Sequence, residues 1–464
     1  MLSLRSQMVR SLTVLFAACA AWGGGSAQPQ GVWAQNPPGQ AGPPGQGAAP
    51  RMVDVLIGFD QPPGAAQRDL VRGRGGEIRR SFWLVPAVAA RIPETAVQAL
   101  ANARGVTVVE PDGEFHAVDD QQSPPPLTEQ QIAAELSYGW GVGHIGAGPL
   151  HAMGKLGASV RVAVLDTGIK SHVELGIAGG GNFTDVGPAH DYLDRHGHGT
   201  HVAGTIAAFR NGFGVVGVAP AVELYGLKVL RDNGSGQFSF MISALEWCVL
   251  NGIDVTNHSY SSGSNPGSLM QQAFDAAYHD FGIVHVAAAG NAGNAGGNND
   301  TVQWPARYAS VVAVAATNQN DSRASFSSSG PAVEVSAPGV SIFSTYIDGL
   351  WVQMSGTSMA SPHVAGVAAL LVAEGVVDPD AIRFVIGATA KPLGSTNRFG
   401  AGLVQAFDAV ALVSDVADPP PGADEPTDPE PEDPPPGDDG PVDPEPEPEN
   451  PPPGRGNGRG NGKK

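Results

Sequence analysis

Between Leu136 and Leu412 the chain alternates short, β-rich apolar runs with stretches of helical character. Strands that are apolar along their whole length, and that alternate with helices, are typical of a parallel sheet buried on both faces. The sequence therefore predicts an α/β domain with a mostly parallel buried sheet over residues 136–412. The runs that we interpret as its strands are VRVAVLD, VELYGLKVL, GIDVTNHS, IVHVAAAGN and VVAVAAT.

A smaller module is predicted ahead of this domain, over residues 51–118. Its segments suit the order strand, helix, two strands joined by a turn, helix and strand, within fewer than 70 residues. The second helix starts at Pro93 and stops at Gly105, which is the expected punctuation of a helix. This order matches the ferredoxin-like α+β arrangement. The segments are MVDVLIGF, AAQRDLVRGRG, EIRRSFWLVPAVAARI, PETAVQALANARG and VTVVEPD.

Residues 1–27 have the form of a secretory signal peptide. Two arginines precede the apolar run LTVLFAACAAW, which is too short to span a membrane comfortably. Small residues ending at Ala20 or Ala27 offer cleavage sites, so we expect a secreted protein with no membrane span. FAAC also resembles a bacterial lipoprotein acceptor, which leaves a lipid anchor through Cys19 as the alternative. Removal of this segment would leave Cys248 as the one cysteine, which excludes an internal disulfide.

Three further segments are predicted to lie outside the two folded modules. Residues 28–50 are rich in Pro, Gly and Gln and are interpreted as a flexible linker. Residues 119–135 form a polar, proline-bearing connector in which proteolysis is expected. Residues 413–464 are predicted to be a disordered acidic tail, because the last 50 residues hold 16 prolines. Those 50 residues contain 14 acidic and 4 basic side chains, about half of the net charge of −19, and the chain offers no electrostatic case for nucleic-acid binding.

Three polar residues stand where an open α/β sheet gathers its functional groups. Asp166 ends the apolar run VAVLD, His198 begins a helical stretch, and Ser358 comes just before a long apolar helix. A serine hydroxyl is a poor nucleophile unless an imidazole accepts its proton, and a carboxylate must orient that imidazole. A serine at a helix N-terminus also lies near backbone N–H donors.

The sequence blocks around these residues resemble the signature blocks of the subtilisin-like serine proteases. The blocks are DTGIKSHVEL, HGTHVAGTIAA, GVAPAVELYGLKVL, AAAGN and GTSMASPHVAGVAAL, and the resemblance covers about residues 136–412. It implies that Asp166 orients His198, that His198 is the general acid/base and that Ser358 is the nucleophile. Asn291, in AAAGN, would donate to the oxyanion together with the Ser358 backbone N–H. The implied protein is a monomeric serine endopeptidase that cleaves extended polypeptides through an acyl-enzyme.

The 51–118 module resembles the propeptides of secreted subtilases, which assist folding and inhibit the mature enzyme. The resemblance implies a self-processing zymogen with its own propeptide as inhibitor. EPDGEFHAV would lie in the active site before self-cleavage. The mature chain would then begin between about Ala117 and Glu135.

The same resemblance places the substrate-binding residues on two edge strands, NGSGQF and HSYSSG. Peptide substrates that pair with such edges use backbone groups, so sequence preference comes from the pockets. Gln303 occupies a position that is commonly glycine at the back of the main specificity pocket, which predicts a shallower and more polar pocket. Phe238 is expected to line an outer apolar pocket. The rim residues are Gly234, Ser235, Gly236, Ser259, Tyr260 and Ser261.

A structural calcium site is expected in the loop RNGFGVVGVAP, after the helix that carries His198. The resemblance implies a mixture of oxygen ligands, which suits calcium. Glu174 stands where Asp is commoner, and the alternative is a glycine-rich loop without an ion. The implied ligands are the side chains of Glu174 and Asn211 and the carbonyls of Phe209, Phe213 and Val215.

Three histidines at H-x-H-x-x-H spacing, His196, His198 and His201, also look like a metal site. The resemblance assigns His198 to catalysis and His201 to packing, so no catalytic metal is expected. His196 stays unassigned, and we expect it close enough to influence the charge on His198. Two other classes are kept as alternatives: a non-catalytic binding protein on the same scaffold, and a metal hydrolase.

Overall fold

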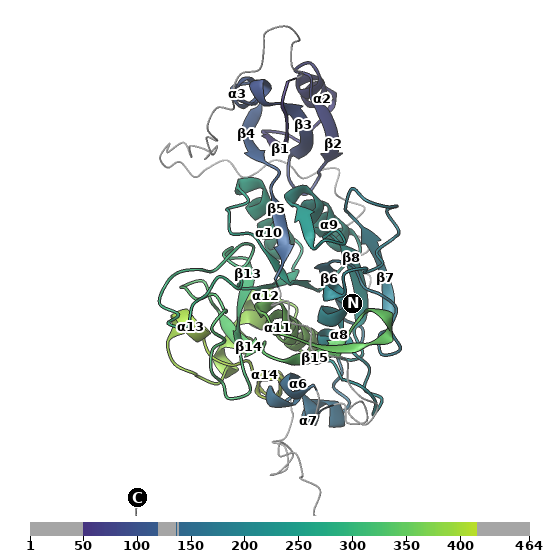
Figure 1. The fold of residues 1–464 in the computed structure, drawn as a ribbon, viewed down its shortest axis with the longest axis vertical. Coiled ribbons are helices and arrows are strands. Elements are labelled where there is room, and N and C mark those ends of the chain that lie inside the picture. The colour runs from purple at the N-terminus through teal and green to yellow at the C-terminus, as the bar shows by residue number, and fades with distance from the viewer. Residues whose placement is uncertain (1–49, 119–135, 137–138, 415–464) are drawn as a thin grey trace, which may run out of the picture. The chain divides into compact units, whose positions relative to one another are not determined.

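The computed structural model describes residues 50–118, 136 and 139–414 (Figure 1). The predicted signal peptide with Cys19, nearly all of the 28–50 linker, the 119–135 connector and the tail from residue 415 lie outside the described residues. Among the helices that the structure describes, none has the length and apolar character needed to cross a membrane.

The N-terminal module is a four-stranded antiparallel sheet with the strand order β2-β3-β1-β4 and with helices on one face. Alternate side chains of β1 pack into two different hydrophobic cores. Val55 and Ile57 pack with the module's own helices, whereas Leu56 joins the cluster around α9 and α10 of the larger domain. The ferredoxin-like prediction is confirmed. The elements are β1 Met52–Phe59, α2 Ala65–Arg72, β2 Glu77–Ser81, β3 Ala87–Pro93, η1 Glu94–Ala96, α3 Val97–Ala101 and β4 Val106–Pro111.

The larger domain is built on a seven-stranded parallel sheet with the order β14-β13-β12-β10-β6-β8-β7. Both faces are buried, because Val162 and Val164 of β6 join one core while Ala163 and Leu165 join the other. The five predicted strands are all present. The sheet consists of β6 Arg161–Asp166, β7 Ile177–Asn182, β8 Glu223–Lys228, β10 Val255–His258, β12 Val284–Ala288, β13 Val311–Thr317 and β14 Val335–Pro338.

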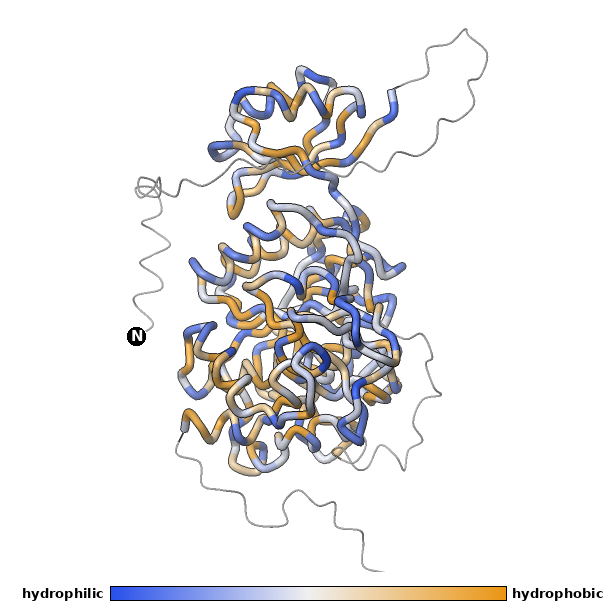
Figure 2. The backbone as a smooth tube through the Cα atoms, turned by 90° about the vertical axis from the view of Figure 1, so that its left-hand side faces the viewer, coloured by the Kyte–Doolittle hydropathy of each residue, from blue (hydrophilic) through white to orange (hydrophobic). Residues whose placement is uncertain are grey.

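Helices cover both faces of this sheet. The core on one side includes residues of α8 and α11, and the core on the other side includes residues of α9 and α10. Figure 2 shows hydrophobic segments, in orange, and hydrophilic segments, in blue, along the chain of both the N-terminal module and the larger domain. The helices are α6 Trp140–His144, α7 Ala147–Ala152, α8 His198–Ala207, α9 Phe238–Leu250, α10 Ser268–His279, η2 Ile347–Gly349, α11 Thr357–Ala373, α12 Pro379–Thr389, α13 Thr396–Phe399 and α14 Ala406–Val413.

Two small sheets complete the domain. One is the antiparallel pair β15 Ile342–Thr345 and β16 Trp351–Met354. The other has the order β11-β5-β9, in which β5 Glu114–Ala117 leaves the N-terminal module and lies between β9 Ser235–Gln237 and β11 Tyr260–Ser261. Segments that are far apart in the sequence therefore form one sheet at the edge of the domain (Figure 1).

Candidate active site

The candidate residues lie at the ends of neighbouring elements. Asp166 is the last residue of β6, and His198 is the first residue of α8. Ser358 is the second residue of α11, so it lies in the first turn of that helix rather than before it. Asn291 follows β12 by three residues. Because β6, β10 and β12 are adjacent and parallel, their carboxyl ends open on one edge of the sheet.

Asp166 and His198 form a buried pair. The Nδ1 atom of His198 lies 2.8 Å from Oδ1 of Asp166, and both side chains are fully buried. A carboxylate can only accept hydrogen bonds, so Nδ1 carries a proton, and in the neutral imidazole the lone pair is then on Nε2. This tautomer is the one that a general base requires.

Ser358 is tied to the edge strand by two hydrogen bonds. Its hydroxyl donates to the carbonyl of Ser259 over 2.9 Å, and the Ser259 hydroxyl donates to the Ser358 carbonyl over 2.8 Å. The place of Ser358 in the first turn of α11 leaves its N–H without an acceptor inside the helix. That N–H is therefore available to an anion at the helix N-terminus.

The amide of Asn291 is held in one orientation. Its Oδ1 accepts hydrogen bonds from the backbone N–H and the hydroxyl of Thr357, over 3.0 and 2.8 Å. Its Nδ2 is buried and has no partner among the described residues. A buried donor without a partner costs about 1–3 kcal/mol, so this N–H suits an acceptor that arrives with the substrate. Thr357 was missed in the sequence, although it directly precedes Ser358 in the GTS block.

Asp194 is a second residue that sequence reasoning missed. It is fully buried and anchors the start of α8, which positions His198. The sequence feature that could have identified Asp194 is its place as an acidic residue four positions before the histidine that begins a helix. The donors to its two oxygens, over 2.6–2.9 Å, are the hydroxyl of Thr167, the amides of His196, Gly197 and Thr200, and the hydroxyl of Thr200.

Gly197 lies in the same turn and allows the ring of Tyr346 to pack closely against the backbone. It has φ of 103°, and a Cβ at this position would lie 2.2 Å from the ring of Tyr346. The Tyr346 hydroxyl donates to the carbonyl of His196 over 3.0 Å. A side chain at residue 197 would therefore displace the segment that leads into His198.

The three closely spaced histidines do not converge on a metal site. The Nε2 atom of His201 donates to the carbonyls of Ile342 and Val352 over 3.0 and 3.1 Å, and burial lowers the pKa of His201 to about 3. The ring centroid of His196 lies 6.2 Å from that of His198. In residues 50–118, 136 and 139–414, no group of three His, Cys, Asp or Glu side chains is placed to hold a metal ion.

The strand β5 is paired on both sides along the edge of the site. It runs antiparallel to β9 and to β11. The amide of Ala117 donates to the Gly234 carbonyl over 2.9 Å, and the amide of Val118 donates to the Ser259 carbonyl over 3.4 Å. The Phe115 ring packs against Phe238 and Tyr260, with centroids 4.8 and 4.9 Å apart.

The loop expected to bind calcium follows α8 and faces a buried carboxylate. Glu174 is fully buried, and its Oε2 accepts from the Val215 amide over 3.1 Å. Asn211 Oδ1 accepts from the Phe213 amide over 3.0 Å. The Phe209 amide donates to the Glu174 carbonyl over 2.9 Å, which holds the two segments together. This concentration of carboxylate, amide and carbonyl oxygens fits an oxygen-ligated cation.

The comparison with known proteins decides the family. Residues 157–402, more than half of the chain, match the Subtilase family. The chain belongs to the subtilase family. Subtilisin E of Bacillus subtilis (strain 168) is 41% identical over 355 residues, which cover 75% of this chain and 88% of that protein. Subtilisin DY of Bacillus licheniformis is 47% identical over 267 residues, or 57% of this chain and 96% of that protein.

A third relative agrees with this assignment. The thermostable alkaline protease of Halalkalibacterium halodurans (strain ATCC BAA-125 / DSM 18197 / FERM 7344 / JCM 9153 / C-125) is 42% identical over 331 residues, or 71% of this chain and 84% of that protein. This subtilase is a serine-type endopeptidase, and its substrates are polypeptides. The alternatives of a non-catalytic binding protein and of a metal hydrolase are thereby excluded.

Proposed function

We propose that this subtilase is made as a secreted, self-processing zymogen, in which residues 51–118 inhibit the enzyme until they are cleaved off. Asp166, His198, Ser358 and Asn291 carry out the cleavage. The observation that carries the proposal is the pairing of β5 with both β9 and β11, which gives the exit segment of the module the position of an extended substrate.

The hydrogen bonds at the end of β5 indicate the bond that is cut. The amide of Val118 and the hydroxyl of Ser358 both donate to the carbonyl of Ser259. Val118 is therefore the residue whose own carbonyl is presented to Ser358, and the scissile bond is Val118–Asp119. This bond lies within the range expected from the sequence, between Ala117 and Glu135.

The chemistry follows from the four side chains. The Ser358 hydroxyl turns from the Ser259 carbonyl to the Nε2 of His198, gives up its proton there and attacks the carbonyl carbon. Asp166 stabilises the imidazolium that results. Asn291 Nδ2 and the Ser358 N–H receive the negative charge on the oxygen. His198 then gives the proton to the leaving amine, and water releases the acyl group by the same steps.

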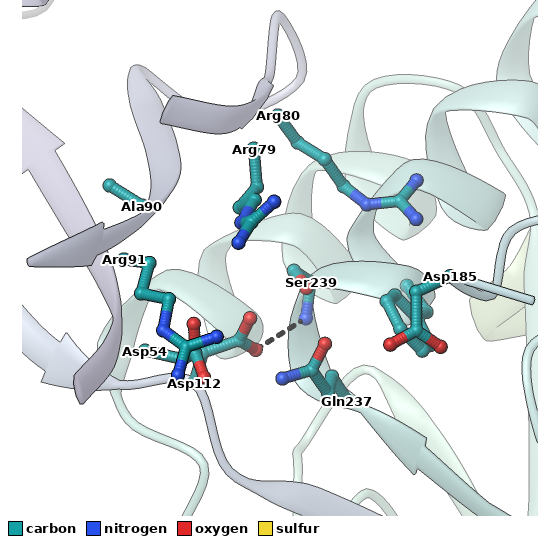
Figure 3. A pocket seen from close by; sticks show the side chains of 10 residues that line it. Asp54, Arg79, Arg80, Ala90, Arg91, Asp112, Asp185, Gln237 and Ser239 are labelled. Atoms are coloured by element: carbon teal, nitrogen blue, oxygen red, sulfur yellow. Dashed lines mark hydrogen bonds between the residues drawn. The ribbon is translucent and has the colours of Figure 1, made fainter. Parts of the chain in front are cut away.

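Two carboxylates of the N-terminal module support its role as a tight inhibitor and folding assistant. Glu110 accepts hydrogen bonds from the amide and hydroxyl of Ser268 and from the amide of Leu269, at the first turn of α10. Asp112 accepts from the Ser239 amide over 2.9 Å, at the first turn of α9 (Figure 3). Both contacts satisfy helix N-termini that would otherwise lack acceptors.

A third contact runs in the opposite direction. Glu246 of α9 accepts from the backbone amides of Trp83 and Leu84, between β2 and β3. Burial raises the pKa of this glutamate. The α9 helix thus both receives an acceptor from the module and supplies one to it, which supports a shared folding unit before cleavage.

A structural calcium ion and export belong to the same proposal. Glu174, Asn211 and the carbonyls of Phe209, Phe213 and Val215 would hold the ion, which would neutralise the buried carboxylate. The signal-like residues 1–27 support secretion, with a lipid anchor through Cys19 as the second outcome.

One experiment tests the zymogen. Wild type and Ser358→Ala are produced in an exporting bacterial host, and the N-terminus and intact mass of each product are measured. Wild type is expected to begin at Asp119 or, after trimming, no later than Glu135, and to bind one phosphonyl group at Ser358. The Ser358→Ala chain is expected to keep the module. Normal maturation of that variant would refute self-processing. A lipid mass on Cys19 of the unprocessed Ser358→Ala chain would show that the precursor is anchored to a membrane.

A further inference from the structure

The loop that carries Gln303 is pinned between two segments of the active site. The amide of Gln303 donates to the Ala289 carbonyl over 2.9 Å, just beyond β12. Its neighbour Trp304 exchanges two hydrogen bonds with Ser262, just beyond β11, over 2.9 and 3.1 Å. The backbone at residue 303 therefore has little freedom, and the direction of its side chain is set by these contacts.

The Gln303 side chain crosses the space between the two segments. Its Oε1 accepts a hydrogen bond from the Ser261 hydroxyl over 2.7 Å. On the other side it lies against Gly290, where a Cβ would be 2.4 Å from that same Oε1. Its Nε2 lies 3.4 Å from the position of a Cβ on Gly263. We call the hydrogen-bonded pair of side chains the Ser261–Gln303 bridge.

This space is where the side chain before the scissile bond has to enter. That residue places its amide on the Ser259 carbonyl, as Val118 does. In the proposed mechanism its carbonyl oxygen has to face Nδ2 of Asn291, which stabilises the oxyanion. Its side chain therefore lies between the segment that begins at Ser259 and the segment that ends at Asn291. Gln303 reaches into this same gap, at the position that the family resemblance assigns to the back of the main pocket.

We propose that the Ser261–Gln303 bridge closes this pocket and restricts the residue before the scissile bond to small side chains of the size of alanine and valine. The proposal rests on the proposed function, because it uses the register in which Val118 precedes the cut bond. A phenylalanine or leucine would have to displace Gln303 and leave the Ser261 hydroxyl without its acceptor. Val118 itself, a small β-branched residue that is almost fully buried, obeys this restriction.

The test measures kcat/KM of the mature enzyme on peptides Phe-His-Ala-X with a fluorogenic leaving group. X is Ala, Val, Leu or Phe, and the first three residues keep the contacts that β5 makes. Wild type is expected to prefer Ala and Val over Phe by at least about tenfold, since misfit in an apolar pocket costs about 10–200-fold. Gln303→Gly is expected to raise kcat/KM for Phe by at least about tenfold. Ser261→Ala, which removes only the hydroxyl, is expected to raise it by less.

Gln405→Gly is the matched control, because among the residues that the structure describes its side chain bonds only to the neighbouring carbonyls of Leu403 and Val404, at the start of α14. It is expected to leave the preference for X unchanged. All enzymes are compared per active site, titrated with a phosphonylating reagent. If the Gln303→Gly chain fails to mature, the effect of Ser261→Ala on the preference for X tests the proposal instead.

Two outcomes would overturn the proposal that the Ser261–Gln303 bridge restricts the pocket. One is a wild-type enzyme that cleaves after Phe or Leu as well as after Ala. The other is a preference that stays unchanged in both bridge variants. A wild-type protein that hydrolyses none of the peptides and does not react at Ser358 would instead refute the proposed function, so the two failures are distinguishable.

Discussion

At the scale of single residues, the orientation of Asn291 decides which of its atoms meets the substrate. Thr357 donates two hydrogen bonds to the amide oxygen of Asn291, which leaves the N–H group for the reacting oxygen in the mechanism that we propose. Asn291→Leu is expected to lower kcat by about a hundred- to a thousandfold, the loss known for this type of donor in subtilisin, with little change in KM. Steady-state kinetics on one peptide substrate measures both. Thr357→Val keeps the shape and loses one of the two bonds to Asn291, together with the acceptor of the Gly290 amide. It should lower kcat by less than Asn291→Leu, and an equal loss would mean that the hydroxyl does more than orient the amide.

Asp194 acts on the same site through the backbone. As a buried carboxylate with five donors it holds the turn before His198, and replacing it by alanine leaves those donors without an acceptor. Asp194→Ala in the inactive Ser358→Ala chain is expected to lower the free energy of unfolding by about 3 kcal/mol or more. Urea unfolding measures this change. Asp191→Ala is the control, since that side chain is more exposed, pairs with Arg195 and accepts only one backbone amide, that of Leu193, among the described residues. Its cost should stay within about 1 kcal/mol.

At the scale of elements, one strand and two helix ends link the N-terminal module to the enzyme. Glu110 supplies the acceptors at the start of α10. Glu110→Ala is expected to weaken inhibition by about 3–30-fold, which corresponds to the loss of a helix cap. The readout is the lag between self-cleavage and the appearance of activity, which should shorten. Glu94→Ala removes an exposed pair with Arg51 and should leave the lag as it is. An equal lag in both variants would show that the cap does not contribute to inhibition.

At the scale of the whole molecule, burial raises the pKa of Asp112 to about 6. The folded chain then binds this proton more tightly than the unfolded chain does. The stabilisation from this group is fully present below about pH 4, the ordinary pKa of an aspartate, and is lost as the pH rises through about 6. In the Ser358→Ala background, the Tm of Asp112→Asn relative to the unsubstituted chain is therefore expected to rise between pH 4 and 7. A difference that stays constant with pH would rule out this contribution.

The proposed calcium ion would also act on the whole molecule. It would offset a carboxylate that is buried between two loops, so its removal should destabilise the folded chain. Chelation is expected to lower the Tm of the Ser358→Ala chain by several degrees, and added calcium should restore it. Glu174→Gln is expected to lose this response, whereas Glu223→Gln, on an exposed carboxylate paired with Arg161, should keep it. A Tm that changes with neither chelator nor added calcium would refute the calcium site.

The core strands could be predicted because each is a continuous apolar run that is buried on both faces. β7 and β14 were not predicted, and both lie at the edges of the sheet. β7 has the sequence IAGGGN, and β14 is the four-residue stretch VSAP. Glycine-rich or very short segments carry no burial pattern, so their strand conformation depends on the partner with which they pair.

The sequence by itself determined the fold class and the candidate residues Asp166, His198, Ser358 and Asn291, because each lies in a local block with its own pattern. Only the tertiary structure decided which groups meet. Thr357 bonds to Asn291 across 66 residues of chain, and Ser261 bonds to Gln303 across 42. Local patterns report which side chains are buried, but a hydrogen bond between distant segments depends on how the sheet brings its edges together.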